Sequence, residues 1–268
     1  MSADDTVLVS SDGPVRIVTM NRPDERNPFN REMHEGMLRT LTDLSDDPDA
    51  RAVVLTGAGP AFSAGGDVFG FTQMAEDLEH RRRVLRLGRR LFDEIVNFPL
   101  PLVAAVNGPA VGLGATLLTS SDIVFMSETS FVADPHVLVA LVAGDGGAIT
   151  WPTLTSLLKA KQYLLTGDSV PAADALALGL ANFVVPADEL MPAALAFAHR
   201  LAALPAQAVQ DTKQVLNQVL RMGSAHSLHL GFATESQSSD TEEYRHVPIQ
   251  ALERRRAREA SRGAGKPD

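Results

Sequence analysis

Two glycine-rich segments are the residues of this chain best suited to chemistry. The first covers residues 61–67 (AFSAGGD) and follows the apolar run 52–56; the second covers 107–114 (NGPAVGLG) and follows the apolar run 102–106. Glycine permits positive φ and lets the backbone approach a ligand closely. Two such turns can leave backbone N–H groups aimed at one point, which forms an oxyanion hole for negative charge on a carbonyl oxygen.

Other catalytic signatures are missing from the sequence. There is no cysteine, hence no thiolate nucleophile or thiolate zinc site, and no serine lies in a Gly-x-Ser-x-Gly turn. The glycine turns lack the third glycine of a dinucleotide fingerprint and the Gly-Lys-Ser/Thr of a phosphate loop. His226 and His229 are three residues apart, but no paired carboxylates accompany them. We therefore predict no metal site and no resident cofactor.

Strands and helices alternate through the first two-thirds of the chain, which predicts an α/β fold. Apolar, β-branched runs predict strands at 15–19, 52–56, 102–106 and 122–126. Apolar residues at helical spacing predict one helix that begins after Asn30, a good N-cap, and another over 72–97. A further helix is expected from the second glycine turn to about residue 119. Both glycine turns thus connect a strand to a following helix.

The pattern changes beyond about residue 186, where alanine and leucine dominate and β-branched runs stop. Helices are predicted at 188–203, 206–221 and 224–238. Residues 253–258 form a basic helix end that leads into a disordered tail, and we expect this terminus to be solvated. We divide the chain into a core over residues 1–200 and a C-terminal helical region over residues 201–268.

Composition narrows the class of partner. The chain has 268 residues and a net charge of −9, which disfavours nucleic-acid binding because phosphate contacts need a basic face. No apolar run reaches the roughly 18–20 residues of a membrane-spanning helix. The N-terminus is acidic and polar, unlike a signal peptide. We therefore expect a cytoplasmic protein with neither nucleic-acid nor membrane partners.

Several motifs, taken in order, resemble the enoyl-CoA hydratase/isomerase (crotonase) family. They are NRP with RN (21–27), LTG with AFSAGGD (55–67), AAVNGPA (104–110), SDI (121–123) and LTGD (165–168). The resemblance implies a crotonase-like spiral of ββα repeats with a C-terminal helical region, acyl-CoA substrates, and a homotrimer or a hexamer made of two trimers. It implies that the N–H groups of Gly66 and Leu113 are the oxyanion donors. It assigns the contacts with CoA, which is part of the substrate, to Arg26, Asn27, Ala64, Gly65, Gly66, Asp67 and Val68.

The catalytic positions depart from the family pattern. A hydratase of the family holds one water between two glutamates, and the resemblance places these at Thr116 and His136 in this chain. Threonine can position a water but is a poor base at neutral pH. Histidine has an ordinary pKa near 6.5 and can serve as acid or base.

The segment around His136 resembles a second branch of the superfamily, the β-diketone hydrolases typified by 6-oxocamphor hydrolase. In that branch a His–Asp pair activates water with help from a later glutamate, which implies roles for His136, Asp145 and Glu235. Asp145 lies in a glycine-rich turn (143–147) that should open a helix. It can orient the imidazole, as in catalytic triads, or only cap that helix. Glu235 is otherwise an ordinary solvated helix residue.

Three functions stay open at this point. The glycine turns are intact, although the hydrolase branch lacks them, which favours an acyl-CoA enzyme of the hydratase/isomerase type. The alternatives are a β-diketone hydrolase that cleaves a C–C bond with His136, Asp145 and Glu235, and a non-catalytic acyl-CoA-binding trimer.

Overall fold

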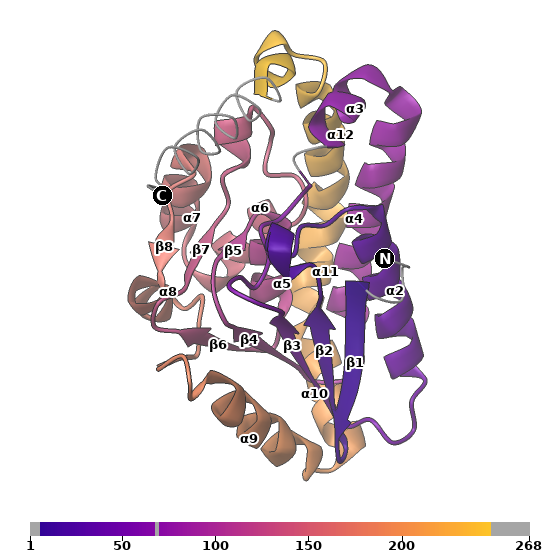
Figure 1. The fold of residues 1–268 in the computed structure, drawn as a ribbon, viewed down its shortest axis with the longest axis vertical. Helices are drawn as coiled ribbons and strands as arrows, with labels where there is room; N and C mark the ends of the chain where they lie inside the picture. Colours follow the sequence, from indigo (N-terminus) through magenta and orange to yellow (C-terminus); the bar gives the residue numbers. More distant parts are fainter. Residues whose placement is uncertain (1–5, 68–69, 248–268) are drawn as a thin grey trace, which may run out of the picture.

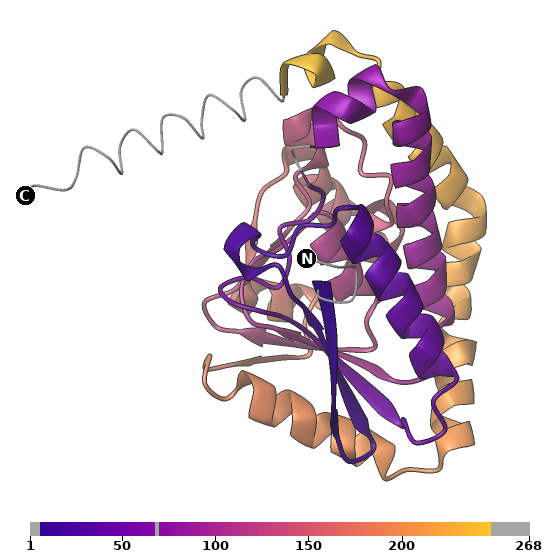
Figure 2. The same cartoon turned by 45° about the vertical axis from the view of Figure 1, so that its right-hand side comes forward.

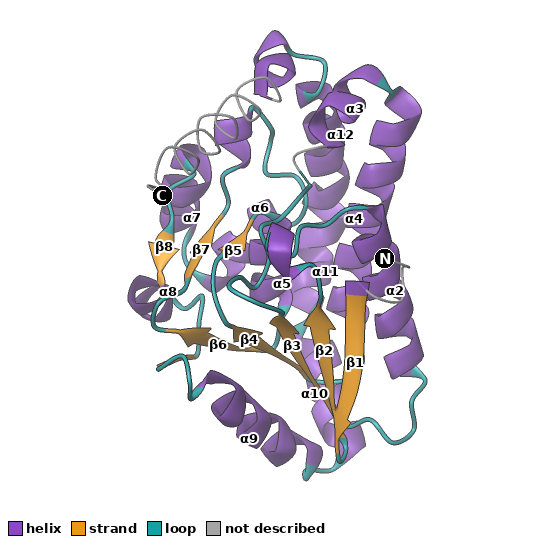
Figure 3. Ribbon diagram, viewed as in Figure 1, coloured by secondary structure: helices purple, strands orange, loops and turns teal. Residues whose placement is uncertain are grey.

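A computed structural model describes residues 6–67 and 70–247 of the chain. Val68, one of the implied CoA contacts, lies outside the described residues. So does the predicted tail beyond residue 253. The described part is built from two β-sheets surrounded by helices (Figure 1, Figure 3).

The larger sheet has six strands in the order β1-β2-β3-β4-β6-β9, which are β1 (Val7–Asp12), β2 (Val15–Met20), β3 (Ala52–Gly57), β4 (Leu102–Val106), β6 (Ile123–Ser127) and β9 (Phe183–Val185). Strand β1 is antiparallel to β2, and every other neighbouring pair is parallel. A parallel sheet needs cover on both faces, which explains why every residue of β3 and β4 is buried.

The smaller sheet has the order β5-β7-β8, with β5 (Ala110–Val111), β7 (Phe131–Ala133) and β8 (Val170–Pro171). Strand β5 is parallel to β7, and β8 is antiparallel to it. Strand β5 begins directly after the turn that ends β4. The second glycine turn therefore crosses from one sheet to the other.

The helices surround the sheets in layers. The α-helices are α2 (Arg31–Ser45), α3 (Phe71–Glu76), α4 (Leu78–Asn97), α5 (Leu113–Ser120), α6 (Gly147–Leu154), α7 (Leu157–Thr166), α8 (Ala172–Leu178), α9 (Leu190–Ala202), α10 (Ala206–Leu216), α11 (Gln218–Gly223) and α12 (His229–Ser238). Two short 3₁₀ helices, η1 (Pro23–Glu25) and η3 (His136–Val139), and a π-helical turn, η4 (Ser224–Leu228), complete them. Figure 2 shows the C-terminal helices running alongside α4.

Helix α9 covers one face of the larger sheet (Figure 1). Its buried residues Leu190, Ala194, Ala198 and Ala202 are four apart, so they form one stripe along the helix. Three of the four are alanines, which lets the helix axis lie close to the strands. The opposite face packs against the main core, to which α2, α4 and α5 contribute.

The predicted strands and the helices before residue 200 agree with the structure, with one correction. The single helix predicted over 72–97 is wrong, because the chain leaves helical geometry at Asp77 (φ −117°, ψ 104°). The Asp77 carboxylate accepts the N–H groups of Glu79 and His80 and caps α4. A second correction concerns Gly223, where a helix break is predicted but φ and ψ stay helical (−59°, −45°).

The α/β class is therefore confirmed, with strands and helices alternating before a helical C-terminal region. The division into residues 1–200 and 201–268 stays a prediction. Within the described ranges, no helix combines the length and the hydropathy needed to cross a bilayer.

The stripe on α9 yields a stability prediction. Ala198 is 0% exposed against the sheet, whereas Ala196 on the same helix is exposed. We expect Ala198→Leu to lower the free energy of unfolding by about 1–3 kcal/mol, because the added carbons overpack the interface. The control, Ala196→Leu, should change it by less than about 0.5 kcal/mol. Urea unfolding measures both values, and equal values for the two variants would contradict the packing described.

Candidate functional site

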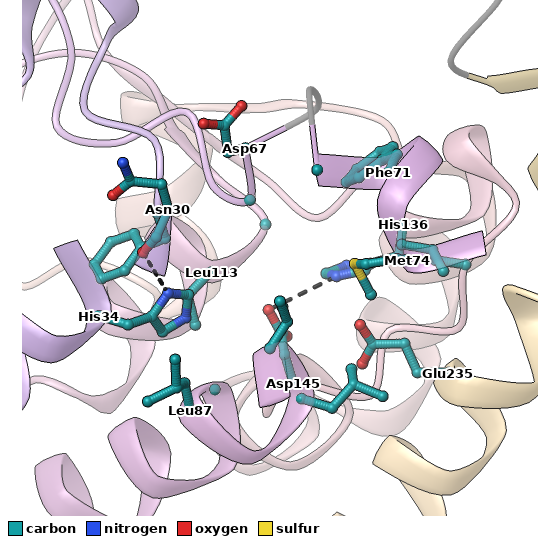
Figure 4. Close-up of a pocket in the computed structure, with 18 of the residues that line it drawn as sticks. Asn30, His34, Asp67, Phe71, Met74, Leu87, Leu113, His136, Asp145 and Glu235 are labelled. Atoms are coloured by element: carbon teal, nitrogen blue, oxygen red, sulfur yellow. Dashed lines mark hydrogen bonds and ion pairs between the residues drawn. The ribbon is translucent and has the colours of Figure 1, made fainter. Parts of the chain in front are cut away.

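A cavity of about 570 Å³ lies between α2, α3, α4 and the two glycine turns (Figure 4). A volume of this size suits a small-molecule ligand. Its wall is mainly apolar, and three polar side chains from distant parts of the chain reach it at one end, namely His136, Asp145 and Glu235. The cavity therefore joins the glycine turns to the acid/base candidates that the sequence singled out.

The two glycine turns are held together by backbone pairing. The N–H of Ser63 donates to Pro109 O at 3.1 Å, and the N–H of Val111 donates to Ser63 O at 2.9 Å. A Cβ on Gly65, whose φ is +84°, would lie 2.5 Å from Val111 O. A Cβ on Gly114 would lie 2.8 Å from both Cβ and O of Ser63. Glycine is thus required at both positions by the close approach of the turns.

Gly66 and Leu113, the two implied oxyanion donors, both line the cavity. Leu113 is the first residue of α5, where a helical N–H has no partner within the helix. Neither N–H donates a hydrogen bond within the described parts of the chain. Two free donors therefore face one cavity, and the first turn of α5 adds the positive end of its dipole.

The implied CoA contacts divide into two groups. Ala64, Gly66 and Asp67 line the cavity, whereas Arg26, Asn27 and Gly65 do not.

Asn27 is fully buried and braces the first glycine turn from behind. Its amide N–H groups donate to Ala58 O and Ala61 O at 2.9 and 2.8 Å. Arg26 is exposed, and its carbonyl accepts the N–H of Ala64 at 2.8 Å. In this structure Asn27 shapes the turn and does not face the ligand space.

His136 begins the short helix η3 and is held by the residue two positions before it. Its Nδ1 pairs with a carboxylate oxygen of Asp134, which is almost fully buried. On the other side of the ring, Nε2 lies 3.7 Å from a carboxylate oxygen of Asp145. The carboxylate in direct contact with His136 is therefore Asp134, a residue that the sequence analysis did not single out as functional.

Asp145 is held by Thr116, which is one of the two positions that the sequence resemblance assigns to a glutamate. The hydroxyl of Thr116 donates to Asp145 Oδ1 at 3.1 Å. Thr116 is buried and does not line the cavity, so it lies behind Asp145. Gly146 occupies the N-cap position of α6, but the Asp145 carboxylate also accepts the backbone N–H of Gly147, the first residue of that helix.

Glu235 reaches the cavity from α12 because two glycines let that helix come close. A Cβ on Gly144 would lie 2.4 Å from Gly231 O, and a Cβ on Gly231 would lie 2.8 Å from Gly144 O. Glu235 is only 6% exposed, and its Oε2 has no hydrogen-bond partner within the described residues. The sequence expectation that Glu235 can be a plain solvated residue is therefore wrong.

Burial and mutual charge set the protonation of this cluster. Burial lowers the pKa of His136, but the carboxylates of Asp134 and Asp145 outweigh it and hold that pKa well above its ordinary value. Burial raises the pKa of Asp145, and the charge on His136 opposes that rise. Burial also raises the pKa of Glu235 to about 8, against the effect of His136. At neutral pH both His136 and Glu235 therefore carry a proton.

The same cluster has the residue types of a metal site. Asp134, His136 and Asp145 offer one ligand atom each, and these atoms lie within 4.8 Å of one another. The contact between Asp134 and His136 Nδ1 already uses two of these side chains for each other. The absence of a metal stays a prediction. His226 and His229 bond instead to Met222 O and to the Arg89 guanidinium.

Comparisons with known proteins identify the family of the chain. The sequence model of the family described as enoyl-CoA hydratase/isomerase matches residues 11–259. The chain belongs to the enoyl-CoA hydratase/isomerase family. The spiral fold that the sequence resemblance implied is thereby confirmed.

Three similar proteins illustrate the range of the enoyl-CoA hydratase/isomerase family. A crystal structure of an enoyl-CoA hydratase/isomerase from Mycobacterium paratuberculosis is 46% identical, with a TM-score of 0.88, over 92% of this chain and 98% of that one. The short-chain-enoyl-CoA hydratase of Clostridium acetobutylicum is 30% identical over 251 residues, or 93% of this chain and 95% of that protein. A β-diketone hydrolase from Anabaena is 26% identical, with a TM-score of 0.81, over 88% and 94% of the two chains.

Protonation of Glu235 makes stability depend on pH. The folded state holds a proton that the unfolded state, with a pKa near 4.5, has released. Stability contributed by this group is therefore lost as the pH rises from about 4.5 to about 8. We expect Glu235→Gln to remove this loss. As the pH rises through this window, the free energy of unfolding of the variant should increase relative to that of wild type by up to about 1.4 kcal/mol per pH unit.

Urea unfolding at a series of pH values across this window measures the difference. Glu128→Gln, which removes an exposed carboxylate, is the control and should track wild type. If Glu235→Gln also tracks wild type, Glu235 is ionised in the folded protein, and the pKa assignment is wrong.

Proposed function

We propose that this protein binds an acyl-CoA thioester and moves a proton next to the thioester carbonyl through an enolate. The N–H groups of Gly66 and Leu113 hold the thioester oxygen, and the cluster of His136, Asp145 and Glu235 exchanges the proton. The observation that carries the proposal is the common cavity: two unpaired backbone donors and a buried acid/base cluster face the same space.

Each group has a distinct part in the proposed reaction. Fixed backbone donors stabilise charge on the oxygen without reorganising, and one such donor typically contributes about 3–4 kcal/mol to lowering the barrier. The Asp145 carboxylate, which lies beside His136 Nε2, takes the α-proton and leaves the enolate. The protonated imidazole of His136, held at Nδ1 by Asp134, then gives its proton to the enolate carbon or to a neighbouring carbon. Asp145, now protonated and with its pKa raised by burial, returns that proton to the neutral His136, while Glu235 keeps its own proton throughout.

This arrangement accommodates both activities named in the family. An isomerase takes a proton from one carbon and returns one to another, which Asp145 and the protonated His136 can do together. A hydratase also needs an activated water. Asp145, which lies beside His136 Nε2, can accept a proton from that water. Crotonyl-CoA, followed at the absorbance of its conjugated thioester, reports hydration by a fall. A 3-enoyl-CoA reports isomerisation by a rise at the same wavelength.

The CoA moiety is placed along the first glycine turn. Ala64, Gly66 and Asp67 supply the wall of the cavity there, and exposed Arg26 offers a cation near the same edge. These contacts are part of the proposal. Asn27 belongs to it as well, because it supports the first glycine turn and so acts on CoA binding indirectly.

We also propose that the protein assembles as a homotrimer or as a hexamer of two trimers. Large apolar side chains are exposed on α7 and on the C-terminal helices, among them Leu158, Leu165, Val215 and Leu230. Contiguous exposed apolar surface is typical of subunit interfaces. Sedimentation equilibrium should give three or six times the chain mass, and a monomer mass would contradict this proposal.

A His136 variant tests the chemistry independently of which reaction the enzyme completes. We expect wild type to exchange the α-protons of butanoyl-CoA in D₂O, measured by mass spectrometry. His136→Ala should slow this exchange by about 10²–10⁴-fold, the usual contribution of general acid/base catalysis, while binding of the thioester persists. His226→Ala, which removes an exposed histidine outside the cavity, is the matched control and should exchange at the wild-type rate.

Other outcomes identify the alternatives. Binding without exchange in wild type would favour a non-catalytic acyl-CoA-binding protein. Cleavage of a cyclic β-diketone, with no binding of CoA esters, would favour the hydrolase that resembles the Anabaena protein. The intact donor turns argue against that second outcome.

A further inference from the structure

A second histidine, His34, faces the cavity from the side opposite His136 (Figure 4). It lies on α2 and is only 5% exposed. Neither the glycine-turn motifs nor the proposed proton transfer gives it a role. A buried histidine in the wall of a ligand cavity therefore needs an explanation of its own.

The hydrogen bond of His34 fixes which ring nitrogen carries the proton. Its Nδ1 lies 2.9 Å from the carbonyl oxygen of Asn30, and a carbonyl can only accept. The proton therefore sits on Nδ1, and Nε2 of the neutral ring presents a lone pair. Burial lowers the pKa of His34 to about 4, so the ring stays neutral at neutral pH.

The acceptor Nε2 has no partner within the described residues. The side chains in contact with the ring are mainly apolar: the Phe29 ring meets His34 edge-on at 5.0 Å between centroids, and Leu87 and Leu113 lie beside it in Figure 4, while Asn30 and Glu32 form a polar edge of the cavity on the same helix. A polar atom in such a wall gains most from a bound group that donates a hydrogen bond to it. A carboxylate or a carbonyl has no proton to donate, and the same burial that lowers the pKa of His34 disfavours an ammonium group beside it.

We infer that His34 is a specificity residue whose Nε2 accepts a hydrogen bond from a hydroxyl group on the acyl chain of the substrate. The inference rests on the proposed acyl-CoA function and names the class of acyl group. Because His34 and His136 lie on opposite sides of the cavity, this hydroxyl belongs to a part of the acyl chain away from the reacting carbons. It is a different group from one that hydration would add beside His136.

Matched pairs of saturated thioesters test the inference by calorimetric binding: butanoyl-CoA against 4-hydroxybutanoyl-CoA, and hexanoyl-CoA against 6-hydroxyhexanoyl-CoA. We expect wild type to bind one hydroxylated member about tenfold more tightly than its alkyl partner, the usual value of one hydrogen bond to a buried acceptor. His34→Leu should abolish the preference while keeping affinity for the alkyl thioesters. His34→Gln, whose side-chain oxygen is again an acceptor, should restore part of it.

The His34 variants have two controls, one for folding and one for the position of the histidine. Loss of the ring leaves Asn30 O satisfied, because it also accepts the N–H of His34 at 3.1 Å, so thermal unfolding of His34→Leu should stay near that of wild type. His226→Leu should retain the wild-type preference.

Three results would overturn the inference. Equal affinity of wild type for both members of each pair would show that Nε2 accepts no hydrogen bond from a hydroxyl group of the acyl chain. An equal loss in His34→Leu for alkyl thioester, hydroxyl thioester and free CoA would place the donor on the CoA moiety. Failure of wild type to bind any thioester or free CoA would instead contradict the proposed function itself, so the two failures are distinguishable.

Discussion

The close contact between the two glycine turns is the constraint on which the rest of the site depends. Ser63 pairs with the strand that leads into α5, and Gly65 and Gly114 leave no space for a side chain between the turns. This contact fixes the distance between the free N–H groups of Gly66 and Leu113. It also joins the two sheets at the edge of the cavity. The donors are therefore positioned by rigid backbone pairing and not by mobile side chains.

The second organising feature is the concentration of carboxyl groups around one imidazole. Three buried carboxyls, those of Asp134, Asp145 and Glu235, act electrostatically on His136. Their mutual repulsion and burial keep protons in the cluster that water would remove at the same pH. Members of the cluster therefore stay protonated in a largely apolar cavity. At the candidate site one imidazole is surrounded by three carboxyl groups.

Much of the fold could be predicted from the sequence, because its signals are local. Continuous β-branched runs marked β2, β3, β4 and β6, and the glycine turns marked the ends of two of them. Strands as short as β5 and β8 carry no periodic signal and depend on pairing between distant segments. The capping of α4 by Asp77 was missed because the apolar spacing continues across it. Similarly, Asp134 was visible in sequence only as the residue before a proline, and its contact with His136 follows from the turn of η3. The sequence did not single out His34, because a histidine among apolar residues on a helix has the same pattern as a residue of the core.

The contact between Gly144 and Gly231 has a consequence for the order in which the protein acquires activity. The sheets and both glycine turns are encoded before residue 186, whereas Glu235 is carried by one of the last helices to be synthesised. A nascent or shortened chain that ends before α12 can contain the two proposed oxyanion donors but lacks one member of the proposed acid/base cluster. Glu235 thus joins the candidate site only after synthesis has reached α12, so the proposed cluster is complete only when the chain is nearly complete.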